Sequence, residues 1–121
     1  MKASLRILVV DDDEAVIEFL TEFLRETGFV VSATSDPDAA VKLAQSQTFD
    51  VALVDMRLPG NSGANIVRQV RLAQPETPCV VMTGFALEDE VQAAFEAGAC
   101  EALSKPFENL MDLVRVLKEA A

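Results

Sequence analysis

Three consecutive aspartates, Asp11, Asp12 and Asp13, follow directly on the apolar run Ile7–Val10. A run without a polar face is typical of a strand that is buried on both sides of a sheet. Like charges at this spacing repel one another, most strongly where the protein excludes water. Asp13 has an ordinary explanation as the N-cap of a following helix. Capping needs only one carboxylate, so Asp11 and Asp12 require compensation by something else in the chain.

Other apolar runs also end in residues that could do chemistry. The run "DVALVD" ends at Asp55, "CVVMTG" ends at Thr83, and Lys105 follows the last short run in "SKPF". Taken one at a time, these residues have ordinary structural explanations: a turn for Asp55, a strand end for Thr83 and a surface charge for Lys105. If the runs end at one edge of a sheet, however, carboxylates, a hydroxyl and an ammonium meet there. That combination suits a divalent cation and a transferred phosphoryl group.

The elements that would position these residues alternate along the chain. Apolar runs predict five strands, at Leu5–Val10, Val30–Thr34, Val51–Val54, Cys79–Met82 and, as a short strand, Ala102–Leu103. Segments of helical periodicity lie between the strands and after the last one. The first has apolar positions at Val16, Phe19, Leu20, Phe23 and Leu24, with Gly28 as its stop.

The other four helices have similar start and stop signals. In the second, Asp36 suits the N-cap and Pro37 the first helical position. The third starts near Ser62 and runs to about Leu72, and the fourth covers about Glu88 to Ala97 and ends at Gly98. The last begins after Pro106, with Leu110, Leu113, Val114 and Leu117 on one face.

This alternation predicts an α/β fold with a doubly wound, five-stranded parallel sheet and five helices. Right-handed crossovers favour the flavodoxin-like strand order 2-1-3-4-5. In such sheets ligands bind outside the carboxyl ends of the strands. Residues 1–121 are expected to form one domain, with no output domain in this chain.

The amino-acid composition further limits the classes of function that the chain can have. The formal charge is −10 and there is no histidine, so we expect no nucleic-acid binding, no His-based catalysis and only a hard, oxygen-bound metal. No apolar run is long enough for a membrane span or a signal peptide, which favours the cytoplasm. Cys79 and Cys100 match no zinc spacing and are predicted to be buried, reduced thiols.

From about Leu5 to Leu117 the sequence resembles the receiver domain of response regulators in bacterial two-component signalling. The resemblance rests on "VVDDD", "VDMRLPGNSG", "VMTGFA" and "EAGACEALSKPF", in this order and spacing. It implies that Asp55 is the phosphoacceptor. It also implies that Asp11, Asp12, Asp55 and the backbone carbonyl of Arg57 form the site for Mg²⁺, with Mn²⁺ as a substitute.

The resemblance assigns further roles. Thr83 and Lys105 would contact the phosphoryl group, and the Lys105–Pro106 peptide would be cis. The donor would be a phosphohistidine on a sensor histidine kinase or phosphotransfer protein. The acyl phosphate would later be lost to water, and the face of the fourth helix, fifth strand and fifth helix would signal to an output domain or protein. A homodimer through that face is left open.

Two other readings use the same residues. "DDDEA" contains the Asp-x-Asp of haloacid-dehalogenase phosphatases, in which Asp11 would be the nucleophile of a turnover enzyme. Against this, Ala15 stands where that signature has Thr or Val. A receiver that binds partners without being phosphorylated is the third reading, and the retained acidic and phosphate-contacting residues argue against it.

One position departs from the receiver pattern. Receivers usually carry Tyr or Phe three residues before the lysine, and this chain has Ala102 there. A methyl group has no rotamer to switch, so signalling is expected to rely on the backbone after Thr83, with Gly84 permitting movement and Phe85 as the bulky side chain that relocates. The lost ring also predicts a more mobile fourth helix.

Overall fold

The structure, a computed structural model, describes residues 4–58, 61–84, 88–105 and 109–121. Within these ranges the main sheet has five parallel strands in the order β2-β1-β3-β6-β7. The strands are β1 (Leu5–Val10), β2 (Phe29–Thr34), β3 (Val51–Asp55), β6 (Cys79–Thr83) and β7 (Ala99–Ser104). Counting only the strands of this sheet, the order is 2-1-3-4-5, which confirms the predicted doubly wound topology.

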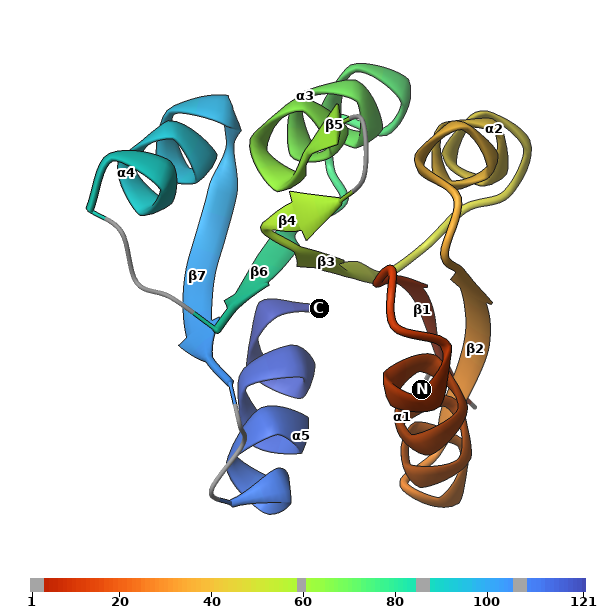
Figure 1. Cartoon of the computed structure of the whole chain (residues 1–121). Coiled ribbons are helices and arrows are strands. Elements are labelled where there is room, and N and C mark those ends of the chain that lie inside the picture. The colour runs from red at the N-terminus through yellow and green to blue at the C-terminus, as the bar shows by residue number, and fades with distance from the viewer. Residues whose placement is uncertain (1–3, 59–60, 85–87, 106–108) are drawn as a thin grey trace.

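Five helices in the described ranges cover the two faces of the sheet (Figure 1). One face carries α2 (Pro37–Ser46), α3 (Gly63–Ala73) and α4 (Glu88–Ala97), and the other carries α1 (Glu14–Glu26) and α5 (Leu110–Ala120). No helix in the described part of the chain is both long and apolar enough to cross a membrane.

The strands separate two apolar cores because successive side chains point to opposite faces. In β1, Leu8 and Val10 pack into the core under α2, α3 and α4, whereas Ile7 and Val9 pack into the core with α1 and α5. All four side chains are fully buried. Burial of such a side chain contributes about 1.5–3 kcal/mol, so the sheet centre is a rigid base for the residues at its edge.

The predicted helix signals are confirmed. The Asp13 carboxylate accepts hydrogen bonds from the N–H groups of Ala15 and Val16, at 2.9 and 3.4 Å, and caps α1. Asp36 caps α2, and Ser62 caps α3. Each cap satisfies an N–H group that the helix cannot pair internally, so the turns that leave the sheet edge are held in place.

Two sequence predictions need correction, the bounds of the fifth strand and the burial of Cys100. The fifth strand is not limited to Ala102–Leu103 but runs over Ala99–Ser104, because its parallel pairing with β6 continues on both sides. Phe19, one of the apolar positions noted for the first helix, is 52% exposed and stacks on Phe23 at the surface of α1.

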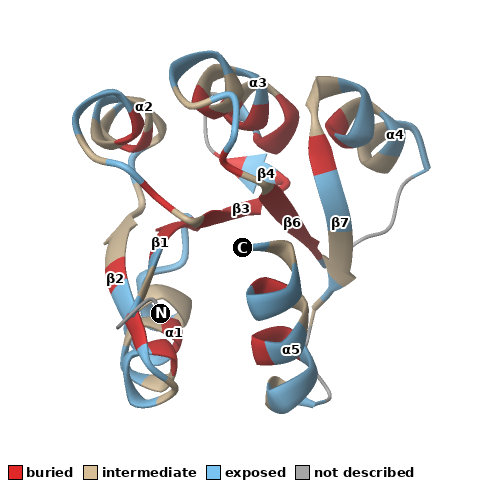
Figure 2. Cartoon of the chain, turned by 180° about the vertical axis from the view of Figure 1, so that it is seen from behind, coloured by how far each residue is buried: buried red, intermediate tan, exposed pale blue. Residues whose placement is uncertain are grey.

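Cys100 is exposed rather than buried, whereas Cys79 is buried as predicted. The pairing register skips Cys100, with Cys79 opposite Ala99 and Val80 opposite Glu101. This irregularity lies in an edge strand, and Figure 2 shows how much of β7 is exposed compared with β3 and β6. The predicted burial of Cys100 is therefore wrong, although apolar residues lie close to it in the sequence.

A short antiparallel hairpin after β3 was also not predicted. It pairs β4 (Arg57–Leu58) with β5 (Asn61–Ser62). These strands have two residues each, too few to produce a period-two pattern in the sequence. The hairpin places Arg57 next to the sheet edge.

Candidate functional site

Four of the predicted residues meet at the carboxyl edge of the sheet. Asp55 and Thr83 are the last residues of β3 and β6, and Asp11 and Lys105 directly follow β1 and β7. Backbone hydrogen bonds continue across this edge. The Met56 N–H donates to the Met82 carbonyl at 2.8 Å, and the Lys105 N–H donates to the Thr83 carbonyl at 2.7 Å. The strand ends, and with them the side chains, are therefore held in a fixed relation.

The predicted acidic cluster is present. Asp11, Asp12 and Asp55 each offer a carboxylate oxygen, and these atoms all lie within 4.8 Å of one another. Asp11 is completely buried and Asp55 is 7% exposed, whereas Asp12 is exposed. Such a cluster of buried and exposed carboxylates concentrates negative charge at the rim of the sheet.

Lys105 compensates part of this charge. Its Nζ lies 2.6 Å from Asp11 Oδ2 and 3.5 Å from Asp55 Oδ2. Burial by itself lowers the pKa of Lys105, but the hydrogen bond to Asp11 and the charges of both aspartates outweigh it and raise that pKa above its usual value. Lys105 is therefore held as a cation between the two carboxylates and supplies part of the compensation that Asp11 was predicted to need.

Asp55 has an unusual acidity. Burial raises its pKa from 3.8 to about 6, and the neighbouring Asp11 adds to the rise, while Lys105 and the N–H of Arg57 oppose it. That N–H donates to Asp55 Oδ1 at 3.3 Å. The raised pKa means that the site, as it stands, disfavours the negatively charged form of Asp55.

The cluster fits a hard divalent cation. Carboxylate oxygens are the ligands that Mg²⁺ prefers, and it keeps several waters, so few protein ligands are needed. Burial, the main cause of the raised pKa of Asp55, and the neighbouring Asp11 both disfavour its ionised form, so an added positive charge would be favourable there. The geometry thus supports a divalent-cation site without identifying the ion; the carbonyl of Arg57 as a further ligand remains a prediction.

A close backbone approach at Gly63 helps to shape the site. The Gly63 N–H donates to the Met56 carbonyl at 2.8 Å. A Cβ at Gly63 would lie 2.5 Å from the Asp55 carbonyl oxygen and 2.6 Å from the Met56 Cα, which is too close for any side chain. Gly63 was not predicted to be a site residue, since a lone glycine at a helix start carries little signal.

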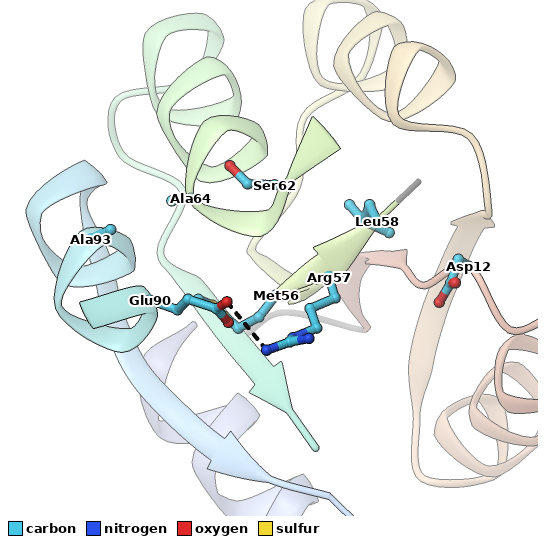
Figure 3. A pocket seen from close by; sticks show the side chains of 8 residues that line it. All are labelled: Asp12, Met56, Arg57, Leu58, Ser62, Ala64, Glu90 and Ala93. Carbon is cyan, nitrogen blue, oxygen red and sulfur yellow. Dashed lines mark hydrogen bonds and ion pairs between the residues drawn. The ribbon is translucent and has the colours of Figure 1, made fainter. Parts of the chain in front are cut away.

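Beside the carboxylates lies a cavity of about 480 Å³ (Figure 3). Asp12, Arg57 and Leu58 line it from the sheet edge and the hairpin, and Glu90 and Ala93 line it from α4. Arg57 Nη2 forms an ion pair with Glu90 Oε1 at 3.3 Å. Glu90 could not be identified from the sequence, because it is one of three acidic residues in the first turn of α4 and nothing local distinguishes it.

Some predictions fall on residues outside the described ranges. These are the cis peptide at Lys105–Pro106 and the relocating side chain of Phe85.

Comparison with known proteins agrees with the geometry. The family model described as the response regulator receiver domain matches residues 7–118, and the chain belongs to this family. Among curated relatives, the regulatory protein VanRB of Enterococcus faecalis is 34% identical over 93% of this chain and 51% of its own length. The chain thus spans about half the length of the first curated relatives it matches.

Solved structures agree as well. A CheY-like receiver domain protein from Methanospirillum hungatei superimposes with a TM-score of 0.91 at 28% identity, covering 96% of this chain and 92% of that one. A response regulator from Burkholderia pseudomallei, solved with a phosphorylated aspartic acid, calcium and citrate, gives a TM-score of 0.87 at 30% identity, covering 94% of this chain and 66% of that one. The chain is therefore a receiver domain with the flavodoxin-like fold.

This membership removes the support for the haloacid-dehalogenase reading. The geometry also disfavours Asp11 as a nucleophile, because that side chain is fully buried. One oxygen accepts from Lys105, and the other accepts from the N–H of Asp13 at 3.0 Å.

Proposed function

We propose that the chain is a phosphorylation-dependent signalling switch in which Asp55 accepts a phosphoryl group from a phosphohistidine. The donor is a sensor histidine kinase or a phosphotransfer protein. The observation that carries the proposal is the position of Asp55: it ends a central strand, within 4.8 Å of two other carboxylates and 3.5 Å from Lys105. The phosphorylated aspartic acid in the Burkholderia pseudomallei relative supports the same chemistry.

In the proposed reaction an oxygen of Asp55 attacks the phosphorus atom. The new O–P bond forms as the P–N bond to the donor imidazole breaks, and the electron pair leaves with that nitrogen. Asp55 must be ionised to attack, and a pKa of about 6 leaves it mostly ionised at neutral pH. Lys105 offsets the repulsion between the carboxylate and the phosphoryl oxygens, and the Thr83 hydroxyl donates to one of them. Catalysis is then mainly positioning and charge neutralisation.

We propose Mg²⁺ as the physiological ion, with Mn²⁺ able to replace it. Asp11, Asp12, Asp55 and the carbonyl of Arg57 would hold it. When bound, the ion supplies charge that neutralises the approach of a carboxylate to an anionic phosphoryl group. The Burkholderia pseudomallei relative was solved with a calcium ion, which supports the binding of a divalent ion by this class of domain.

The phosphorylated state is proposed to end by slow hydrolysis at the same site. The chain thus catalyses its own phosphorylation and dephosphorylation and has no separate substrate to turn over. The surface formed by α4, β7 and α5 passes the signal to a downstream output domain or protein in the cytoplasm, and a homodimer through this surface is compatible with the proposal. We propose no direct contact with nucleic acid or membrane, since the net charge is −10.

The Asp55→Asn variant tests the proposal. With acetyl phosphate and Mg²⁺, the wild-type protein should gain the mass of one phosphoryl group, and the variant should gain none. Asp112→Asn is the matched control, because it removes a carboxylate from the exposed face of α5. Stoichiometric labelling of Asp55→Asn would show that another residue is the acceptor.

A further inference from the structure

We propose that the Arg57–Glu90 ion pair is a latch that holds the first turn of α4 against strand β4 until Asp55 carries a phosphoryl group. This inference rests on the proposed function and adds a switching device specific to this chain. The phosphoryl group competes for the Arg57 guanidinium, so Glu90 loses its partner and the first turn of α4 is released.

Arg57 lies between the two sides that it would link. It stands at the sheet edge, where its N–H donates to the Asp55 carboxylate at 3.3 Å. Its side chain reaches Glu90 on α4 at 3.3 Å (Figure 3). Asp12 of the acidic cluster and Glu90 line the same cavity of about 480 Å³. The cavity gives the guanidinium room to turn from one side to the other.

Glu90 is held incompletely. Its Oε1 accepts from Arg57, but its Oε2 is buried and has no hydrogen-bond partner among the described residues. A carboxylate oxygen in this state is costly, so the pairing of Glu90 is easily exchanged for solvation when the helix shifts.

The rest of α4 is weakly anchored. Ala94 is its only buried residue in the part of the chain that the structure describes, and Ala102 on β7 presents only a methyl group to the same core. With so little apolar area beneath it, α4 depends more than other helices on polar contacts at its start.

The charges favour the proposed exchange. A phosphoryl group adds a charge of about −1.5 to −2 and three acceptor oxygens, and guanidinium groups bind such oxygens in pairs. The Arg57 and Glu90 side chains are 55% and 38% exposed, so their pair is weak. A weak pair next to a strong new anion is suited to reversible release.

Hydrogen–deuterium exchange of the α4 peptide, followed by mass spectrometry, tests the latch. The samples are wild type, Glu90→Gln, Arg57→Gln, the double variant and the control Glu88→Gln, each with and without Mg²⁺ and beryllofluoride, a phosphoryl mimic. Glu88→Gln removes the same charge from the same helical turn at a residue that does not line the cavity. Fluorine NMR reports whether beryllofluoride binds.

Without the mimic, we expect Glu90→Gln and Arg57→Gln each to speed hydrogen exchange in α4 about two- to threefold. This factor matches the small stabilisation that an exposed ion pair provides. The double variant should exchange no faster than either single variant, and Glu88→Gln should exchange at the wild-type rate. Beryllofluoride should speed α4 exchange in wild type but add little in Glu90→Gln. If the mimic binds and Glu90→Gln behaves like wild type or like Glu88→Gln, the latch is wrong and the proposed function stands. If wild type does not bind the mimic, both are wrong.

Discussion

Lys105 Nζ and Asp11 Oδ2 lie 2.6 Å apart, although 94 positions separate the two residues in the sequence. The Asp11 side chain is fully buried, and that of Lys105 is 21% exposed. A buried carboxylate without a partner is strongly unfavourable, so this contact is part of what makes the acidic edge compatible with folding.

Replacing Lys105 by Met is therefore expected to destabilise the metal-free protein. The variant leaves the buried Asp11 without its cation, and we expect the free energy of unfolding to fall by about 2 kcal/mol in urea titrations with EDTA. Mg²⁺ should recover part of the loss, because it restores positive charge to the cluster. Lys118→Met, at an exposed position of α5, is the control. Equal unfolding free energies for the two variants would contradict the role of the pair.

The pKa of Asp55 predicts a pH dependence of stability. Because this pKa is raised from 3.8 to about 6, the folded protein holds the proton more tightly than the unfolded chain. The favourable contribution is complete below about pH 4 and is lost as the pH rises through about 6.

Asp55→Asn lacks this titration. In EDTA it should be more stable than wild type above pH 6, by at most about 3 kcal/mol, and the difference should vanish near pH 4. Urea unfolding of both proteins across this range measures it, and Mg²⁺ should reduce the difference at neutral pH. A difference that does not change with pH would show that Asp55 is not the titrating group.

The close approach at Gly63 predicts a sharp contrast between two glycines. Gly63→Ala would push a methyl group into the backbone of Asp55 and Met56, at 2.5 and 2.6 Å. We expect a loss of about 2 kcal/mol or more in unfolding free energy and weaker Mg²⁺ binding, since the acceptor strand must shift. Gly84→Ala meets nothing within 4 Å and should change stability by no more than about 0.5 kcal/mol. Similar effects of both variants would rule out the packing explanation.

The absence of a ring at Ala102 predicts where the conformational change occurs. Because a methyl group cannot switch rotamers, the backbone after Thr83 should carry the response. Structures determined with and without beryllofluoride should therefore differ between Gly84 and Glu90. If this segment superimposes in the two states, the backbone-based switch is wrong.

Much of the fold could be predicted from the sequence, because it depends on local patterns. Continuous apolar runs marked β1, β3 and β6, and the caps Asp13 and Asp36 marked where helices begin. The alternation of strand and helix then placed Asp11, Asp55, Thr83 and Lys105 at one edge, since parallel strands all end on the same side of a sheet. Local patterns failed at the edge strand, where burial depends on the neighbouring elements, and Cys100 is exposed for that reason.

The sequence by itself therefore determined the order of the elements and the residue types at the carboxyl edge. Only the tertiary structure decided which side chains pair there and how far their acidities shift. Lys105 meets Asp11, and Arg57 meets Glu90, across 94 and 33 positions of sequence. Distances of a few ångströms and the local exclusion of water control these contacts, and both arise only when strands and helices distant in the chain are packed together.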